Sequence, residues 1–132
     1  MDSAEADEGA IVAGNDFDRI RKQVRQFVVE RDWDQFHSPK NLSMALIVEA
    51  AEMVEHFQWL TEEQSSNLPP TKLAEVELEL ADIQIYLLSL AEKLQLDLIA
   101  AVDKKLVLNA RKYPAEQVRG SSKKYTEYKN RS

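Results

Sequence analysis

The chain of 132 residues contains no cysteine. Disulfide bonds, thiol nucleophiles and zinc sites with sulfur ligands are therefore excluded. No apolar run approaches the roughly 18–20 residues that a membrane helix needs, and the acidic N-terminus lacks the basic start of a signal peptide. We therefore expect a cytoplasmic chain without a membrane partner.

Glycine and histidine are also scarce. None of the three glycines lies between Asn15 and Arg119, which excludes a P-loop or a Rossmann phosphate loop in that range. A di-iron carboxylate bundle needs a Glu-x-x-His pair on two helices. The two histidines, His37 and His56, do not lie three residues after a glutamate, so this centre is not favoured. The net charge of −6 argues against a polymeric nucleic acid as partner.

Charge is concentrated at the two ends of the chain. Residues 1–16 carry five acidic and no basic residues, whereas residues 111–132 carry seven basic and two acidic ones. Ends of this kind are usually solvated tails, although contact between the basic end and an anionic ligand remains an alternative. We expect a disordered segment over residues 1–14, a helical domain over 15–113 and a basic tail over 114–132.

Apolar residues recur at helical spacing in four segments, about residues 15–31, 42–60, 71–94 and 98–112. The expected N-caps of these helices are Asn15 or Asp16, Asn41, Thr71 and Asp97. Four helices joined by short connections predict an all-α fold, a four-helix bundle. The second and third helices are apolar on nearly every face. One small bundle cannot cover them, so we expect a homodimer or homotetramer.

Two acidic pairs interrupt these apolar helices. Glu49 and Glu52 are the only charges in residues 45–54, and Glu79 and Asp82 are the only charges in residues 78–90. Residues three apart leave the same face of a helix. A solvated acidic stripe is the alternative interpretation, but such a stripe usually includes other polar residues. Oxygen ligands alone favour a hard cation such as Mg2+, so the four carboxylates are predicted metal ligands.

These acidic pairs and several sharper motifs resemble a known family. Glu49-x-x-Glu52, 26 residues and Glu79-x-x-Asp82 resemble the signature of the MazG-like, all-α nucleoside triphosphate pyrophosphatases. The likeness extends from about Phe17 to Tyr128. Five further segments resemble the dCTP pyrophosphatase branch: Glu30-Arg-Asp-Trp-Asp-Gln-Phe-His37, Pro39 with Asn41-Leu42, Phe57-Gln-Trp59, Asn109-x-Arg-Lys-Tyr-Pro114 and Ser121-Ser-Lys-Lys-Tyr-Thr126.

The resemblance implies a Mg2+-dependent hydrolase of nucleotide metabolism that converts dCTP, or a modified dCTP, to the monophosphate and pyrophosphate. It also implies a dimer or a dimer of dimers. The implied metal ligands are Glu49, Glu52, Glu79 and Asp82. Substrate contacts are implied for Trp33, His37, Trp59, Tyr86, Lys105, Asn109 and Lys112. The chain has Val24 where some members have a histidine, which puts base contacts from the first helix in doubt.

The residues themselves support part of this assignment. A triphosphate can lie beside acidic side chains only if cations bridge the negative groups. Lys105, Asn109 and Lys112 share one helix face. The alternative interpretation of that face is an ordinary solvated stripe. The alternative for Trp33 and Trp59 is that both are core residues. We expect an activated water to attack phosphorus, with Glu49 or Glu52 as the catalytic proton acceptor. Pyrophosphatases for dUTP, damaged nucleotides or phosphoribosyl-ATP, and a non-catalytic metal-stabilised helical module, remain the alternatives.

Overall fold

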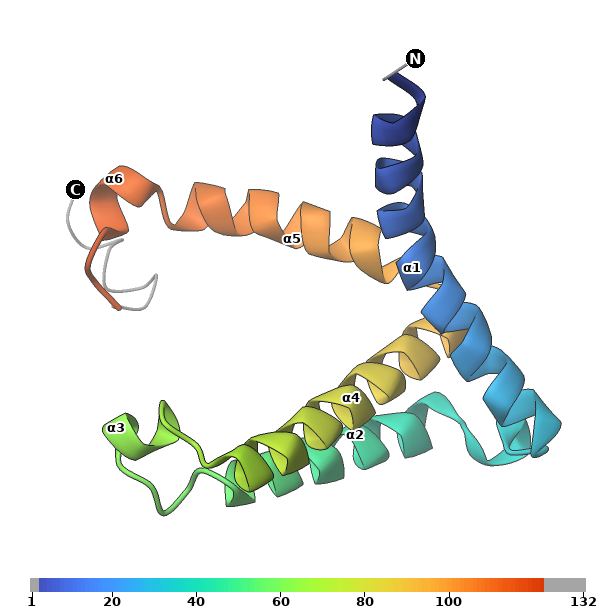
Figure 1. Cartoon of the computed structure of the whole chain (residues 1–132), viewed down its shortest axis with the longest axis horizontal. Coiled ribbons are helices and arrows are strands. Elements are labelled where there is room, and N and C mark those ends of the chain that lie inside the picture. The colour runs from blue at the N-terminus through green and yellow to red at the C-terminus, as the bar shows by residue number, and fades with distance from the viewer. Residues whose placement is uncertain (1–2, 123–132) are drawn as a thin grey trace. The chain divides into compact units, whose positions relative to one another are not determined.

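A computed structural model describes the backbone of residues 3–122 and the side chains of residues 16–122. Every regular element in that range is a helix (Figure 1). The chain divides into two compact units, Met1–Gln95 and Leu96–Ser132. None of the described helices is long and apolar enough to cross a membrane.

The first helix of the first unit is α1, Ser3–Glu30. The predicted start at Asn15 is wrong, because residues 3–14, which we expected to be disordered, continue the helix. Alanine and glutamate are strong helix formers and recur in this segment, and these local preferences are consistent with the longer helix. The predicted end near Arg31 is confirmed, and Asp32 follows it with a positive φ of 53°. The division of the chain at residues 14 and 113 stays a prediction.

The loop after α1 contains the 3-10 turn η1, Asp34–Phe36, and leads into α2, Pro39–Glu55. The N-cap is Ser38 and not Asn41, because the Ser38 hydroxyl accepts from the Asn41 backbone N–H at 3.1 Å. Proline suits the first turn, where its missing N–H leaves no bond unmade. The helix ends at Glu55, five residues before the predicted Leu60.

A short helix and a long one complete the first unit. Helix α3, Glu62–Ser65, is held by a capping box between Thr61 and Gln64 that we did not predict. Helix α4, Pro70–Lys93, ends within one residue of the predicted Leu94. Its predicted cap, Thr71, is wrong: Pro70 starts the helix and no side chain caps it.

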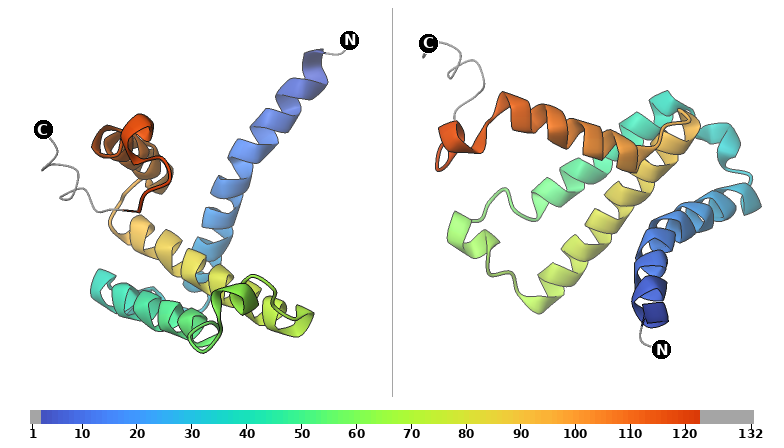
Figure 2. Two further views of the ribbon diagram at one scale, coloured as in Figure 1. Left: turned by 90° about the vertical axis from the view of Figure 1, so that its left-hand side faces the viewer. Right: turned by 90° about the horizontal axis from the view of Figure 1, so that it is seen from above.

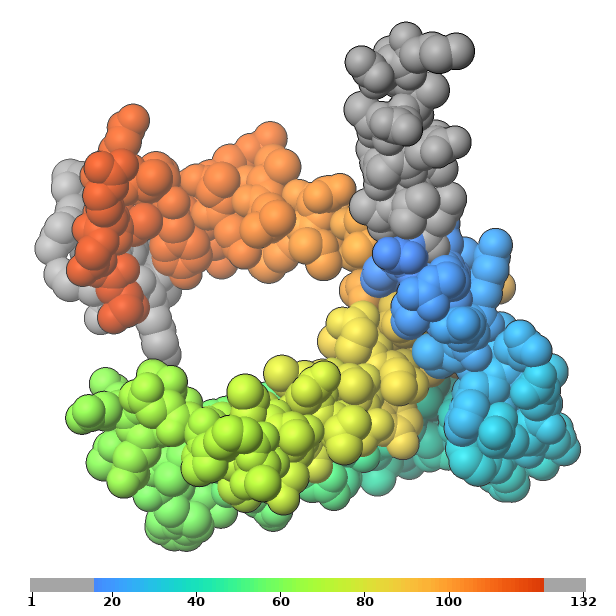
Figure 3. All heavy atoms as spheres, in the orientation of Figure 1, coloured from blue at the N-terminus to red at the C-terminus, as the bar shows by residue number. Residues whose placement is uncertain are grey.

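Helices α2 and α4 run side by side in opposite directions (Figures 1 and 2), and α1 packs against α4. In the space-filling view, side chains of α4 lie directly against those of α2 (Figure 3). The buried apolar side chains of this unit are Val28, Leu42, Val76 and Leu88, and Leu42 is only 1% exposed. Ile47 and Leu78 are more than half exposed. The two central helices therefore carry apolar surface that the first unit by itself leaves uncovered, and the predicted homodimer or homotetramer stays a prediction.

The second unit contains α5, Leu98–Lys112, and the short α6, Ala115–Val118. The predicted cap of α5 is confirmed, since the Asp97 carboxylate accepts from the Ala100 backbone N–H at 3.0 Å. The segment 114–132, expected as a basic tail, includes α6, and its residues 123–132 lie outside the described range.

A candidate carboxylate metal centre

The packing of α2 against α4 brings carboxylates from both helices together. Glu49 on α2 and Glu79 and Asp82 on α4 each offer an oxygen, and these oxygens lie within 4.8 Å of one another. Glu49 and Glu79 are half-buried, whereas Asp82 is exposed. The helical spacing predicted the two acidic faces, and the antiparallel pairing turns them toward each other. The arrangement can hold a divalent cation through oxygen ligands.

Glu52 lies beside this cluster but is not one of its three close members. Its side chain is exposed, and it follows Glu49 by slightly less than one turn of α2. Glu52 still affects Glu49, because its nearby carboxyl helps to raise the pKa of the Glu49 carboxyl. The structure thus separates the two glutamates of the first pair, and the role of Glu52 as a ligand stays a prediction.

The carboxyl groups of the cluster lie close together and are partly withdrawn from water. Burial is the main cause that raises the pKa of Glu49 from 4.5 to about 7, followed by the neighbouring carboxyls of Glu79 and Glu52. Among the described residues, Glu49 Oε2 and Glu79 Oε2 are buried without a hydrogen-bond partner. A buried polar atom without a partner is costly. A bound cation would supply the missing contact to both oxygens, so the residues fit such an ion.

A basic group lies at one side of the cluster, where α2 ends and α4 begins. His56 is only 17% exposed, and its Nε2 lies 3.9 Å from Glu79 Oε1. Lys72 Nζ lies 3.3 Å from His56 Nδ1 and donates to Glu75 Oε2 at 3.0 Å. This hydrogen bond lowers the pKa of Glu75, which therefore pairs with Lys72. Sequence reasoning missed the contact of His56 with Glu79, although His56 follows Glu49 by seven residues and so shares its helix face.

The predicted aromatic residues fall at three separate places in the first unit. Trp33 is 44% exposed and meets Phe27 edge to face, with ring centroids 5.7 Å apart. Trp59 lies in the turns after α2 and is 87% exposed, so it is not part of the core of the first unit. Tyr86 is half-buried on α4, about one turn after Asp82. Within a single chain, these three side chains therefore do not lie together around one binding site.

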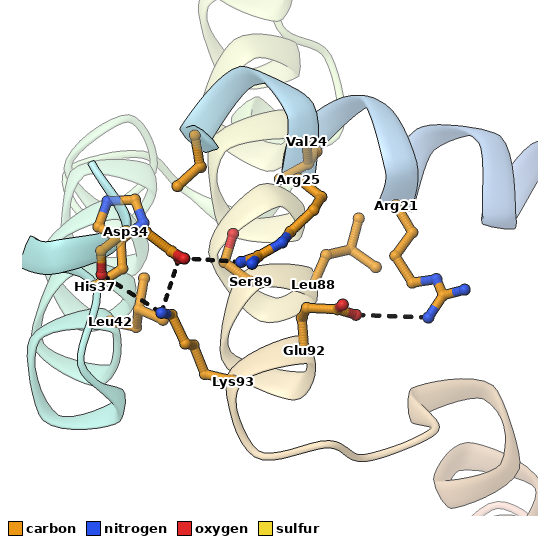
Figure 4. Close-up of a pocket in the computed structure, with 11 residues that line it drawn as sticks. Arg21, Val24, Arg25, Asp34, His37, Leu42, Leu88, Ser89, Glu92 and Lys93 are labelled. Atoms are coloured by element: carbon orange, nitrogen blue, oxygen red, sulfur yellow. Dashed lines mark hydrogen bonds and ion pairs between the residues drawn. The ribbon is translucent and has the colours of Figure 1, made fainter. Parts of the chain in front are cut away.

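His37 lines a cavity between α1, the start of α2 and the end of α4 (Figure 4). The cavity is small and partly open to solvent, with about 20 Å³ of space for the centre of a water molecule. At its edge Asp34 Oδ1 accepts from Lys93 Nζ at 2.8 Å and from Arg25 Nη1 at 3.0 Å. Lys93 is the main cause that lowers the pKa of Asp34. Sequence reasoning did not find this ion network, since its members are far apart in the chain.

The predicted phosphate contacts belong to the second unit. Lys105, Asn109 and Lys112 are spaced four and three residues apart on α5, so they share one face of that helix. Asn109 is half-buried within its unit and the two lysines are exposed. Their part in substrate binding stays a prediction.

The described residues define an all-α protein with a candidate carboxylate centre for a divalent cation on two packed helices. Within that class, the chain belongs to the MazG-like family, which matches residues 44–128. The chain is similar to dCTP pyrophosphatase 1 from Homo sapiens, with 44% identity over 110 residues, and from Rattus norvegicus, with 41%. These matches cover 82% of this chain and 65% of each relative.

A solved structure supports the same assignment. A pyrophosphatase from Archaeoglobus fulgidus superposes with a TM-score of 0.71 at 36% identity, covering 74% of this chain and 92% of that one. The predicted family and the all-α pyrophosphatase fold are therefore confirmed.

Proposed function

We propose that this chain is a Mg2+-dependent nucleoside triphosphate pyrophosphohydrolase that acts on dCTP or a modified dCTP. The products are the nucleoside monophosphate and pyrophosphate. The observation that carries the proposal is the cluster of Glu49, Glu79 and Asp82, with two buried oxygens lacking partners, in a chain of the MazG-like family. The names of the relatives support dCTP as substrate, and clearing such nucleotides from the pool is the proposed role.

Four carboxylates of the two central helices would hold the cation: Glu49, Glu52, Glu79 and Asp82. When bound, Mg2+ would neutralise phosphate charge and make a water more acidic. The half-buried Glu49 and Glu79 would give the ion fixed ligands, whereas the exposed Glu52 and Asp82 would face the substrate. Glu49 or Glu52 would accept the proton of the attacking water, because both lie on the face of α2 that carries the cluster.

Groups outside the cluster would select the nucleotide. We propose that Trp33 and Trp59 stack on the base, and that His37 and Tyr86 contact base or sugar. The exposure of both tryptophan rings supports this role, because a ring that stacks on a ligand must be accessible. The polar face of α5, Lys105, Asn109 and Lys112, would bind the phosphates and the sugar.

A homodimer or homotetramer would complete this site. Several large apolar side chains of α2 and α4 are more than half exposed, including Ile47, Val48, Leu78 and Leu80. An apolar surface of this kind favours a protein partner, and a second copy of the chain is the partner proposed. Such a partner would also bring side chains of a second chain to the acidic cluster.

A substrate panel tests the function. The purified chain is incubated with dCTP, 5-methyl-dCTP, dTTP, dUTP, dATP and dGTP in Mg2+ or EDTA, and the products are separated by ion-exchange chromatography. We expect dCTP and its 5-substituted form to give monophosphate and pyrophosphate fastest, and only with Mg2+. A faster reaction with dUTP or a purine would assign another nucleotide. Thermal stabilisation by Mg2+ without turnover of any nucleotide would support a non-catalytic helical module instead.

A further inference from the structure

The basic group beside the acidic cluster forms an ordered chain of contacts between two helices. His56 is the C-cap residue of α2, and Lys72, Glu75 and Glu79 follow one face of α4 at spacings of three and four. Lys72 Nζ meets both His56 Nδ1 at 3.3 Å and Glu75 Oε2 at 3.0 Å. On its other side the imidazole directs Nε2 toward Glu79 Oε1 at 3.9 Å. His56 thus lies between a lysine and a carboxylate of the cluster.

The contact with Lys72 favours one of the two tautomers of the neutral imidazole. A lysine ammonium has three donor hydrogens and no acceptor. At 3.3 Å from Lys72, His56 Nδ1 can therefore only accept. Glu75 Oε2 is the alternative partner of Nδ1, but at 3.7 Å it lies beyond hydrogen-bond length. In a neutral imidazole the proton then lies on Nε2, which is the nitrogen directed at Glu79.

The two oxygens of Glu79 have different surroundings. Oε1 faces His56 Nε2, whereas Oε2 is buried without a hydrogen-bond partner among the described residues. At 3.9 Å the contact of Oε1 is too long for a hydrogen bond, and an approach of about 1 Å would form one. An N–H on Nε2 would attract Oε1 and so favour the rotamer that leaves Oε2 for a cation.

We propose that His56 is a positioning residue, which uses the Nε2–H set by Lys72 to orient Glu79 for cation binding. The proposal rests on the proposed function only through the cation site. Groups that orient metal ligands typically change metal affinity by about 10–100-fold when they are removed. Neither His56 nor Lys72 needs to contact the ion or the nucleotide for this effect.

Manganese binding without nucleotide tests this role. Mn2+ affinity of the full chain is measured by electron paramagnetic resonance for wild type, His56→Gln, His56→Asn and Lys72→Met. The glutamine amide places an N–H near the position of Nε2, whereas the shorter asparagine reaches only that of Nδ1. We expect His56→Asn to bind Mn2+ about 10-fold more weakly, and His56→Gln to retain most of the affinity. Lys22→Met, the same change at an exposed lysine of α1, is the matched control and should bind as wild type does.

A second measurement addresses the tautomer directly. Long-range 1H–15N spectra of the imidazole should show His56 protonated at Nε2 in wild type, and a mixture of both tautomers in Lys72→Met. A merely structural histidine would show neither this dependence on Lys72 nor the rescue by glutamine. Wild-type affinity in His56→Asn, or a proton on Nδ1 in wild type, overturns the proposal. If wild type itself fails to bind Mn2+, the proposed cation site fails together with this inference.

Discussion

Glu49→Gln should stabilise the metal-free protein, although it removes a proposed ligand. The half-buried Glu49 carboxyl has its pKa raised from 4.5 to about 7, mainly by burial. The folded state therefore binds this proton more tightly than the unfolded state does, and the wild-type chain loses stability as pH rises from about 4.5 to 7. Above that window the full cost of the buried charge is present, and below it the cost is absent.

The magnitude follows from the size of the shift. A full shift from 4.5 to about 7 corresponds to about 3 kcal/mol, because each pKa unit is worth about 1.4 kcal/mol. Glu49 is only half-buried, and screening by water reduces this to about 1–2 kcal/mol. For a chain of this size the gain is about 3–10 °C in Tm.

The assay is thermal unfolding in EDTA at several pH values and one fixed protein concentration, since assembly also affects Tm. We expect Glu49→Gln to melt above wild type at pH 8 and to converge with it toward pH 4.5. Glu77→Gln is the matched control, because it makes the same change at an exposed position of α4. A Glu49→Gln chain that is no more stable than wild type at pH 8 would refute the reasoning. In saturating Mg2+ the order should reverse, since wild type alone keeps the full ligand set.

Three further results are expected. Glu52→Gln should lose pyrophosphate release by orders of magnitude while its circular dichroism stays unchanged, and near-normal turnover in saturating Mg2+ would place the catalytic centre elsewhere. Trp59→Ala should weaken dCTP binding by about 1–3 kcal/mol, the scale of base–aromatic stacking, and an unchanged KM would remove this ring from the site. Asp34 has its pKa lowered by Lys93 and Arg25, so its pairing stabilises the fold at neutral pH and is lost as pH falls through the lowered pKa. Asp34→Asn should therefore lower Tm at pH 7 but hardly at pH 2.5, and an equal loss at both pH values would contradict the ion network.

The acidic centre shows where sequence reasoning was sufficient and where it stopped. Spacing alone placed Glu49 and Glu79 on apolar helix faces, since a period of 3.6 residues is a local property of the chain. Distances between oxygens depend on how two helices pack, so the sequence could not separate Glu49, which is close to Glu79, from Glu52, which is exposed. The contact of His56 with Lys72 depends on the same packing.

The predictions of the helix caps were partly wrong, for a different reason. Asp97 was correctly predicted as the N-cap of α5, because no other side chain in that turn competes for the backbone N–H. Before α2 both Ser38 and Asn41 offer a capping side chain, and proline at position 39 decides in favour of Ser38. Before α4 the same effect of Pro70 removes the predicted cap at Thr71. Both prolines are visible in the sequence, but the prediction gave too little weight to their effect on where a helix begins.

The sequence by itself determined an all-α chain with four long helices, two acidic faces and an excess of apolar surface, because each follows from residue type and period. Only the tertiary structure decided which carboxylate oxygens meet, that Lys72 faces His56, and that Asp34 joins Lys93 to Arg25 across three elements. The contact between Asp34 and Lys93 joins residues 59 positions apart in the chain. Such contacts depend on the approach of one helix to another, which local preferences do not specify.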